Sequence, residues 1–302
     1  MPSHRKPTPA QIQAAEAKRT EILGQLADGI DRLTSSDGWR KYLDVQSRFH
    51  RYSFHNTLLI LCQRPDATQV ASFKKWLELE RHVVKGETSL RIFAPSFRKE
   101  EVERSEGGTE EVQKLSGFRL VPVFDVSQTE GEPLPEPVKL LEGEDAGGMF
   151  GKLSKVAEKL GYRVQVTPEI EGHPGANGLC EYGLKTLTVA GNRSELQQVK
   201  SLAHEIGHAM LHEPDAEGKR DITRDTCELE AESVAYVTCQ SLGLDTSDYS
   251  FGYVAGWKGG DAEQAREAIK ASGQRISGAS KQILDGLEAE REVEADRELE
   301  MA

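Results

Sequence analysis

The sequence has few cysteines and no long hydrophobic segment. Its 302 residues include four cysteines, which lie far apart and form no CxxC pair. This spacing favours reduced thiols in a cytoplasm over a disulfide framework, and it argues against zinc held by cysteine. The most apolar stretch, Thr57 to Cys62, is far too short to cross a bilayer. The N-terminus does not resemble a secretory signal, so we expect a cytoplasmic protein with no membrane segment.

Negative charge dominates the chain but is unevenly distributed. The net charge is −12, which by itself argues against nucleic acid as a partner. Residues 1–100 nevertheless carry 17 lysine and arginine side chains against 11 carboxylates, an excess of +6. The asymmetry suggests a basic partner-binding module joined to an acidic one. Ordinary variation in composition explains the same excess equally well.

The N-terminal part of the chain reads as helices followed by strands. Helical spacing and capping residues predict helices over most of residues 9–79. A period of two then predicts a hairpin formed by residues 82–84 and 89–93, and another strand at 118–124. The charged segment 99–114 is interpreted as a loose connection between strands.

A Pro-rich acidic stretch, residues 131–148, is the predicted linker between two domains. We assign residues 1–130 to a helical and β-hairpin domain and residues 149–290 to a second domain. Predicted strands and helices alternate irregularly, so the fold class is α+β. The second domain is expected to end in two helices with a break at Gly273, and residues 291–302 form an acidic tail.

The segment His204-Glu205-Ile206-Gly207-His208 has the HExxH pattern of zinc-binding helices. Because the two histidines are four residues apart on a helix, their imidazoles project from one face and can share one metal ion. Glu205 lies beside the open position of such a site, where it can take a proton from water that the metal acidifies. A chance match is the alternative. The apolar neighbours argue against it, because they indicate a half-buried helix on which unpaired polar groups are costly.

An acidic helix further along the chain offers a third ligand. Glu228 and Glu232 are four residues apart and share one face, whereas Glu230 points elsewhere. A catalytic tetrahedral site needs three protein ligands and leaves the fourth position to water. We assign Glu228 to the metal and Glu232 to the far nitrogen of a ligand histidine. Glu230 is expected on a solvated face, and His212 is expected to be a polar residue at the helix end.

The HEIGH sequence at 204–208 and the ExxAE sequence at 228–232 resemble the zincin-like peptidase domain of two groups of proteins. One group contains bacterial regulators that cleave phage repressors or respond to radiation. The other contains antirestriction proteins of the ArdC type, to which residues 235–257 are similar. The resemblance implies a zincin-like domain of the gluzincin type with zinc (Zn2+) as cofactor and a protein as substrate, and it supports Glu228 as a ligand.

The N-terminal half resembles the single-stranded-DNA-binding domain of ArdC-like proteins. The motifs that carry this resemblance are Tyr52-Ser-Phe-His-Asn56, Lys74-Lys-Trp76, Val84-Lys-Gly-Glu87 and Phe124-Asp-Val-Ser-Gln128-Thr129. A single-strand site requires basic side chains and aromatic platforms. The candidates are Arg51, Tyr52, Asn56, Lys74, Lys75, Trp76, Lys85, Arg91 and Phe93. Trp76 and Phe93 fit the hydrophobic core at least as well.

Three functions fit these patterns. The first is an ArdC-like protein that binds single-stranded DNA, carries a zinc metallopeptidase-type domain and serves antirestriction or another role of mobile elements. The second is a regulatory zinc protease that cleaves a repressor protein. The third is a purely structural zinc site, which has no use for a general base such as Glu205. The acidic charge predicts that any DNA binding depends strongly on salt.

Overall fold

The computed structural model describes residues 8–103, 109–134, 146–215, 218, 222–249, 251 and 261–301. The chain divides into two compact units. Unit 1 comprises residues 1–29 and 58–134, and unit 2 comprises residues 30–57 and 135–302. Residues 30–57, which the sequence pattern places with the N-terminal half, thus belong to the unit of the C-terminal half. Most of the predicted linker, residues 135–145, lies outside the described residues.

Unit 1 combines helices with short strands and one long hairpin. Two helices, α1 (Pro9–Arg32) and α3 (Phe54–Gln63), run across the boundary between the units. The other elements are β1 (Val70–Ala71), α4 (Phe73–Glu78), β2 (Arg81–Val83), β3 (Leu90–Glu103), β4 (Thr109–Asp125), the 3-10 turn η1 (Val126–Gln128) and β5 (Thr129–Gly131). Their pairing gives a sheet of order β1-β4-β3 and a separate pair β2-β5.

Helix α4 is anchored to the core of unit 1 by its tryptophan. Ser72 caps the helix by accepting the backbone N–H of Lys75 at 3.2 Å, as its position before the helix predicts. Trp76 is 1% exposed, and its indole Nε1 donates to the backbone carbonyl of Phe124 at 2.9 Å. The ring therefore fills the core, and its polar atom is satisfied by β4.

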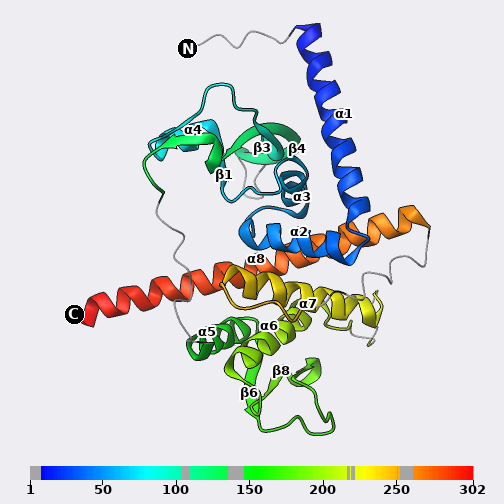
Figure 1. Cartoon of the computed structure of the whole chain (residues 1–302), viewed down its shortest axis with the longest axis vertical. Helices are drawn as coiled ribbons and strands as arrows, with labels where there is room; N and C mark the ends of the chain where they lie inside the picture. Colours follow the sequence, from blue (N-terminus) through cyan, green and yellow to red (C-terminus); the bar gives the residue numbers. More distant parts are fainter. Residues whose placement is uncertain are drawn as a thin grey trace. The chain divides into compact units, whose positions relative to one another are not determined.

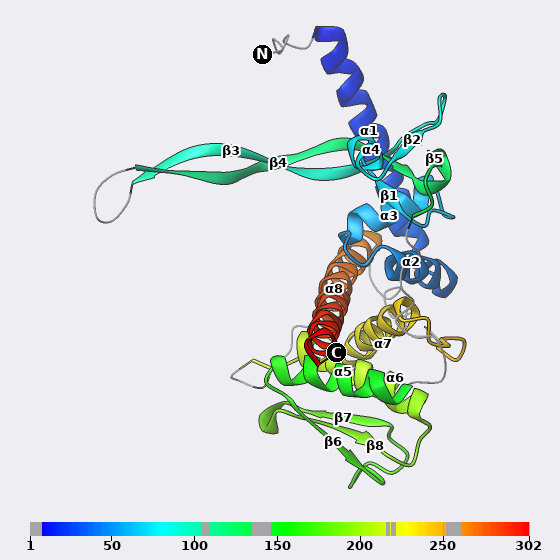
Figure 2. The ribbon, with the colours of Figure 1, turned by 90° about the vertical axis from the view of Figure 1, so that its left-hand side faces the viewer.

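The predicted hairpin of residues 82–84 and 89–93 is wrong. β2 pairs with β5, and β3 pairs with β4. The described parts of the charged segment interpreted as a loop, residues 99–103 and 109–114, form the outer part of this ribbon, which is paired from Leu90↔Val123 to Glu103↔Thr109 (Figure 2). Ion pairs across the strands, Lys99–Glu111 at 2.5 Å and Lys114–Glu100 at 3.2 Å, allow charged strands to pair.

Unit 2 contains a three-stranded sheet and a group of packed helices (Figure 1). Its elements are α2 (Ser36–Arg48), α5 (Ala146–Lys159), β6 (Arg163–Thr167), β7 (Gly178–Glu181), the 3-10 turn η2 (Tyr182–Leu184), β8 (Thr186–Ala190), α6 (Glu195–Leu211), α7 (Arg224–Ser241) and α8 (Ala262–Met301). The strand order is β6-β8-β7, with β6 parallel and β7 antiparallel to β8. β7 is therefore an edge strand, and helix α6 packs beside it. The α+β class predicted from the sequence is confirmed.

Two buried contacts hold the outer helices of unit 2 in place. Trp39 of α2 is fully buried, and its indole Nε1 donates to Ser233 of α7 at 3.0 Å. The predicted break at Gly273 is wrong, because α8 continues through it. A Cβ at position 273 would lie 2.3 Å from the ring of Phe54, so the glycine permits close packing inside a continuous helix.

No helix in the described ranges is long and apolar enough to span a membrane.

Candidate metal centre

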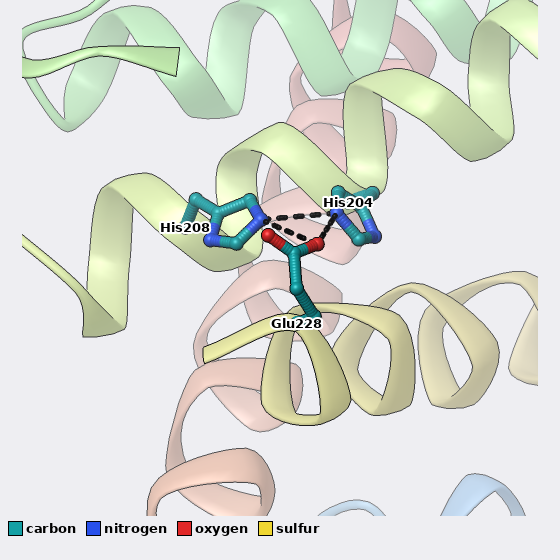
Figure 3. A group of neighbouring side chains, drawn as sticks. All are labelled: His204, His208 and Glu228. Carbon is teal, nitrogen blue, oxygen red and sulfur yellow. Dashed lines mark hydrogen bonds and ion pairs between the residues drawn. The ribbon is translucent and has the colours of Figure 1, made fainter. Parts of the chain in front are cut away.

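Helix α6 presents two imidazoles on one face. The helix is held by buried apolar residues on either side of the motif, including Leu202 and Ile206. His204 and His208 are one turn apart, and their Nε2 atoms lie 3.0 Å from each other. Figure 3 shows both rings projecting from the same helix toward one point.

Helix α7 brings a carboxylate to the same point. Glu228 Oε2 lies 3.5 Å from His204 Nε2 and 3.6 Å from His208 Nε2. One ligand atom from each of the three residues lies within 4.8 Å of the others (Figure 3). Two imidazole nitrogens and one carboxylate oxygen are the protein ligands of a common class of catalytic metal site. The residues present therefore fit a divalent metal ion.

Glu232, one turn further along α7, contacts the opposite side of His204. Its Oε2 lies 3.0 Å from His204 Nδ1. A carboxylate in this position favours a proton on Nδ1 and leaves the lone pair of Nε2 for a metal. The division of roles between Glu228 and Glu232 stays a prediction, for which these two placements provide a geometric basis.

Glu230 and His212 are not surface residues, so this part of the sequence interpretation is wrong. Glu230 is 0% exposed and His212 is 2% exposed. His212 Nδ1 lies 2.9 Å from His208 Nδ1, and His212 Nε2 lies 3.2 Å from Glu230 Oε2. Ser272 and Arg275 of α8 both donate to Glu230. Helical periodicity correctly turned Glu230 away from Glu228, but α8 covers that side of α7, and only the tertiary structure decides this.

Glu205 faces a polar pocket of about 280 Å³ beside His204. The other residues that line it include Asn177, Gln197, Lys200, Ser201, Asp248 and Tyr249. Gly178 of the edge strand β7 makes room for the carboxylate, because a Cβ at this position would lie 2.3 Å from Glu205 Oε1. Burial raises the pKa of Glu205 to about 7, against the opposing effect of His204. A carboxylate with this pKa is suited to proton transfer near neutral pH.

The electrostatics of the cluster favour a positive charge between the ligands. Burial works against the charged form of His204, but hydrogen bonds to Glu228 and Glu232 outweigh it and raise the pKa of His204 to about 10. The hydrogen bonds from His204 and His208 hold the pKa of Glu228 well below its usual range. A metal ion would take the place of this proton, because ligands bind metal in their deprotonated forms.

Comparisons with known families match two separate segments of the chain. Residues 15–124 match the N-terminal domain of the anti-restriction factor ArdC. Residues 157–239, which contain the whole candidate metal centre, match a peptidase family described as the IrrE N-terminal-like domain. The chain thus combines a segment similar to the ArdC N-terminal domain with a segment similar to the IrrE-type peptidase domain. The resemblance drawn from its motifs is thereby confirmed, and so is a peptidase-type domain around the HExxH helix.

Individual proteins and solved structures resemble the chain at low sequence identity. The uncharacterized protein pXO2-81 of Bacillus anthracis is 24% identical over 338 aligned residues, which include 97% of this chain. The chain spans 56% of the length of that relative. Two crystal structures of the antirestriction protein ArdC from plasmid R388 are also similar. The metal-free structure has 18% identity, a TM-score of 0.45 and coverage of 79% of this chain and 86% of its own. The Mn(II)-bound structure has 16% identity, a TM-score of 0.49 and coverage of 87% and 97%.

The residues predicted to bind DNA belong to both units. Lys74, Lys75, Trp76, Lys85, Arg91 and Phe93 lie in unit 1, whereas Arg51, Tyr52 and Asn56 lie in unit 2. Trp76 is a core residue, as the sequence allowed, and its ring is not accessible for stacking. The three lysines are exposed, and Arg51 forms an ion pair with Glu288. Their roles in DNA binding stay predictions.

Two accessible aromatic residues of unit 1 lie on the β3–β4 ribbon, and a third, Phe73, lies in α4. The sequence interpretation singled out none of the three. Phe97 and Phe118 are each 55% exposed, and Leu115 is 51% exposed. Strand register pairs Phe97 with Leu115 and Pro95 with Phe118, so all four lie on one face of the ribbon. We call these four residues the apolar ribbon face. The alternation of apolar residues from Phe93 to Phe97 was the available signal, but the strand was predicted to end too early.

Proposed function

We propose that the chain binds single-stranded DNA through unit 1 and hydrolyses peptide bonds at a zinc centre in unit 2. The hydrolase part rests on one observation: three converging ligands lie next to a buried glutamate that faces an open polar pocket. A structural zinc site is closed by four protein ligands and has no need of a general base. Three ligands with Glu205 beside them are instead the arrangement of a catalytic centre.

Zinc is the ion that this donor set favours, because imidazole and carboxylate ligands in a three-residue site are typical of zinc hydrolases. Bound zinc supplies a Lewis acid that polarises a carbonyl group and acidifies water. Glu205 takes the proton from water and delivers it to the departing amine. The edge strand β7, whose Gly178 touches Glu205, is placed to pair with an extended peptide.

The DNA-binding part is supported by the match to the ArdC N-terminal domain and by the apolar ribbon face. Exposed phenyl rings stack on unpaired bases, and this stacking tolerates any base sequence. Arg119 is exposed on the same ribbon and supplies positive charge for phosphates, and so do Arg98 and Lys114, which share one carboxylate, Glu100. Antirestriction, or another role in the transfer of mobile DNA, is the biological setting that this combination suggests.

The alternative is a regulatory zinc protease that recognises a repressor protein through unit 1. The match of residues 157–239 to the IrrE N-terminal-like domain supports the peptidase chemistry that this alternative requires. The two functions differ in the partner of unit 1 and share the same zinc chemistry. Binding of oligonucleotides therefore distinguishes them.

The test is metal analysis and oligonucleotide binding on one purified sample of the full chain. We expect one zinc per chain, and fluorescence anisotropy should show stronger binding to a single strand than to the matching duplex. Affinity should fall with salt, with a logarithmic slope of about −0.7 per phosphate neutralised. Equal binding to duplex and single strand, or no binding at low salt, would exclude the DNA-binding part. A sample without metal after growth and dialysis in zinc would exclude the zinc centre.

A further inference from the structure

A series of buried polar side chains runs from His208 into helix α8. His208 Nδ1 lies 2.9 Å from His212 Nδ1, and His212 Nε2 lies 3.2 Å from Glu230 Oε2. Glu230 Oε1 accepts from Ser272 Oγ at 2.6 Å and from Arg275 Nε at 3.1 Å. The side chains of His212 and Glu230 are both 0% exposed, so bulk water does not reach them. We call His212, Glu230, Ser272 and Arg275 the His208 relay.

The order of donors and acceptors in the His208 relay determines where its protons lie. An ionised carboxylate only accepts hydrogen bonds, so Glu230 requires an N–H at His212 Nε2. A neutral imidazole has one N–H, so His212 Nδ1 is then an acceptor and His208 Nδ1 must donate to it. His208 therefore keeps its lone pair on Nε2. This is the nitrogen that faces His204 and Glu228.

This order of donors and acceptors requires an ionised Glu230, and the residues around Glu230 favour that form. The guanidinium of Arg275 forms an ion pair with Glu230, and Ser272 Oγ donates to it at 2.6 Å, so the buried carboxylate has a positively charged partner in its ionised form. Ser272 and Arg275 also fix the orientation of the carboxylate, because both of them donate to it. The second oxygen, Oε2, accepts from Arg275 Nε at 3.0 Å and faces His212 Nε2.

We propose that Glu230, held by Ser272 and Arg275, positions His208 for the metal ion through His212. The inference rests on the proposed zinc centre and adds positioning residues that touch neither the ion nor a substrate. The two ligand histidines are thus supported differently. His204 contacts the carboxylate of Glu232, whose side chain is 35% exposed. His208 depends on the fully buried side chains of His212 and Glu230, and Glu230 is held from α8, so helix α8 contributes to the metal affinity of a site built on α6 and α7.

Glu230→Gln is the decisive variant, because it keeps the shape of the side chain and replaces one acceptor by a donor. Ser272 and Arg275 both donate, so the amide oxygen will turn to them and the NH₂ group will face His212. His212 must then accept at Nε2 and carry its proton on Nδ1. That arrangement moves the proton of His208 to Nε2 and removes the lone pair from the metal side. We expect zinc affinity to fall by about 10–100-fold.

Two measurements on the full chain test this proposal. A competition titration with a chromophoric chelator gives the zinc affinity, and nitrogen-15 NMR reports which imidazole nitrogens carry protons. In the zinc-loaded parent we expect N–H at His208 Nδ1 and His212 Nε2, and in Glu230→Gln we expect the proton of His212 on Nδ1. Arg266→Gln is the matched control, because it removes an exposed ion pair between α8 and Asp31. It should change neither measurement.

Arg275→Lys keeps the positive charge but not the planar group that fixes the Glu230 carboxylate. It should weaken zinc binding less than Glu230→Gln does, and it decides the matter if Glu230→Gln fails to fold. Unchanged zinc affinity with unchanged proton positions in the folded variant would overturn the relay. A parent protein that binds no zinc would overturn the zinc centre instead. The proton positions of His208 and His212 in the metal-free chain would then still decide the relay.

Discussion

Gly207, within the HExxH segment of α6, lies directly against Ala231 of α7. A Cβ at position 207 would lie 3.1 Å from the Ala231 Cα and 3.3 Å from its carbonyl oxygen. Two small residues therefore let the helix backbones approach closely. This approach brings Glu228 of α7 within reach of the two imidazoles of α6.

Gly207→Val should separate the two helices and weaken metal binding. Overpacking of this kind costs about 1–3 kcal/mol of stability, and Glu228 should move away from the histidines. The control is Gly151→Val in α5, where nothing lies within 4 Å of the added Cβ. Both variants carry the same change in helix propensity, since valine favours the helix more than glycine does. Thermal unfolding and zinc affinity should therefore separate packing from propensity. Parent-like zinc affinity in Gly207→Val would show that this contact does not set the ligand geometry.

Replacement of any predicted metal ligand should abolish stoichiometric zinc binding. His204→Ala, His208→Ala and Glu228→Ala each remove one of three donors, whereas Glu232→Gln removes only a contact to His204 and should weaken affinity by about 10–100-fold. Elemental analysis after dialysis measures the first effect, and chelator competition measures the second. Glu195→Gln, an exposed change on the same helix, should be neutral. If Glu232→Ala loses the metal while Glu228→Ala keeps it, the two roles are reversed.

Glu205→Gln should keep the zinc and the fold but abolish hydrolysis, because an amide cannot accept the proton. Gly178→Ala should also keep the zinc and the fold, and it should reduce hydrolysis without abolishing it. The new methyl group would meet the Glu205 carboxylate, not the ligands, and displace it. Peptide cleavage and zinc content, measured on the same samples, test both variants. Full peptidase activity in Glu205→Gln would remove this residue from the mechanism.

Phe97→Ala combined with Phe118→Ala should weaken binding of single-stranded DNA by about 1–3 kcal/mol for each stacked base. The salt dependence should stay the same, because no charge is lost. Lys74→Ala with Lys75→Ala should lower both the affinity and the salt slope. Leu184→Ala is the control, since Leu184 is 72% exposed and lies in unit 2. Parent-like affinity of the double phenylalanine variant would exclude the apolar ribbon face as the stacking surface.

Asp125→Asn should destabilise the chain at neutral pH by about 1–3 kcal/mol. The carboxylate accepts backbone N–H groups of Thr68, Gln69 and Ser127. These hydrogen bonds outweigh the effect of burial and lower the pKa of Asp125. Its contribution is therefore complete above the unfolded pKa of about 3.9 and is lost as the pH falls through the lower folded value. Urea unfolding should show the difference between variant and parent shrinking at acid pH. A difference independent of pH would contradict this account.

The HExxH helix could be predicted in detail because its information is local. Four-residue spacing alone places His204 and His208 on one face, and the same rule separates Glu228 and Glu232 from Glu230. The cap of α4 was also readable, since Ser72 acts on a backbone group three residues away. For α6 the sequence allowed Asn192 or Ser194, and the structure has Ser194. The domain composition followed from motifs that are contiguous in the chain.

The strand partners and the surroundings of the site could not be obtained in this way. β2 pairs with β5 and not with β3, a choice that depends on contacts between residues far apart in sequence. Trp76 is buried, whereas Phe97 and Phe118 of the β3–β4 ribbon are exposed, and no local pattern distinguishes these rings.

The sequence by itself determined which side chains share a helix face, because this depends on backbone geometry over one or two turns. Only the tertiary structure decided that Glu230 and His212 are buried. Their position relative to their own helices is the same with or without α8. Burial is a property of the packed helices together, and the arrival of Ser272 and Arg275 converts an acidic surface position into an internal hydrogen-bond partner of the metal centre.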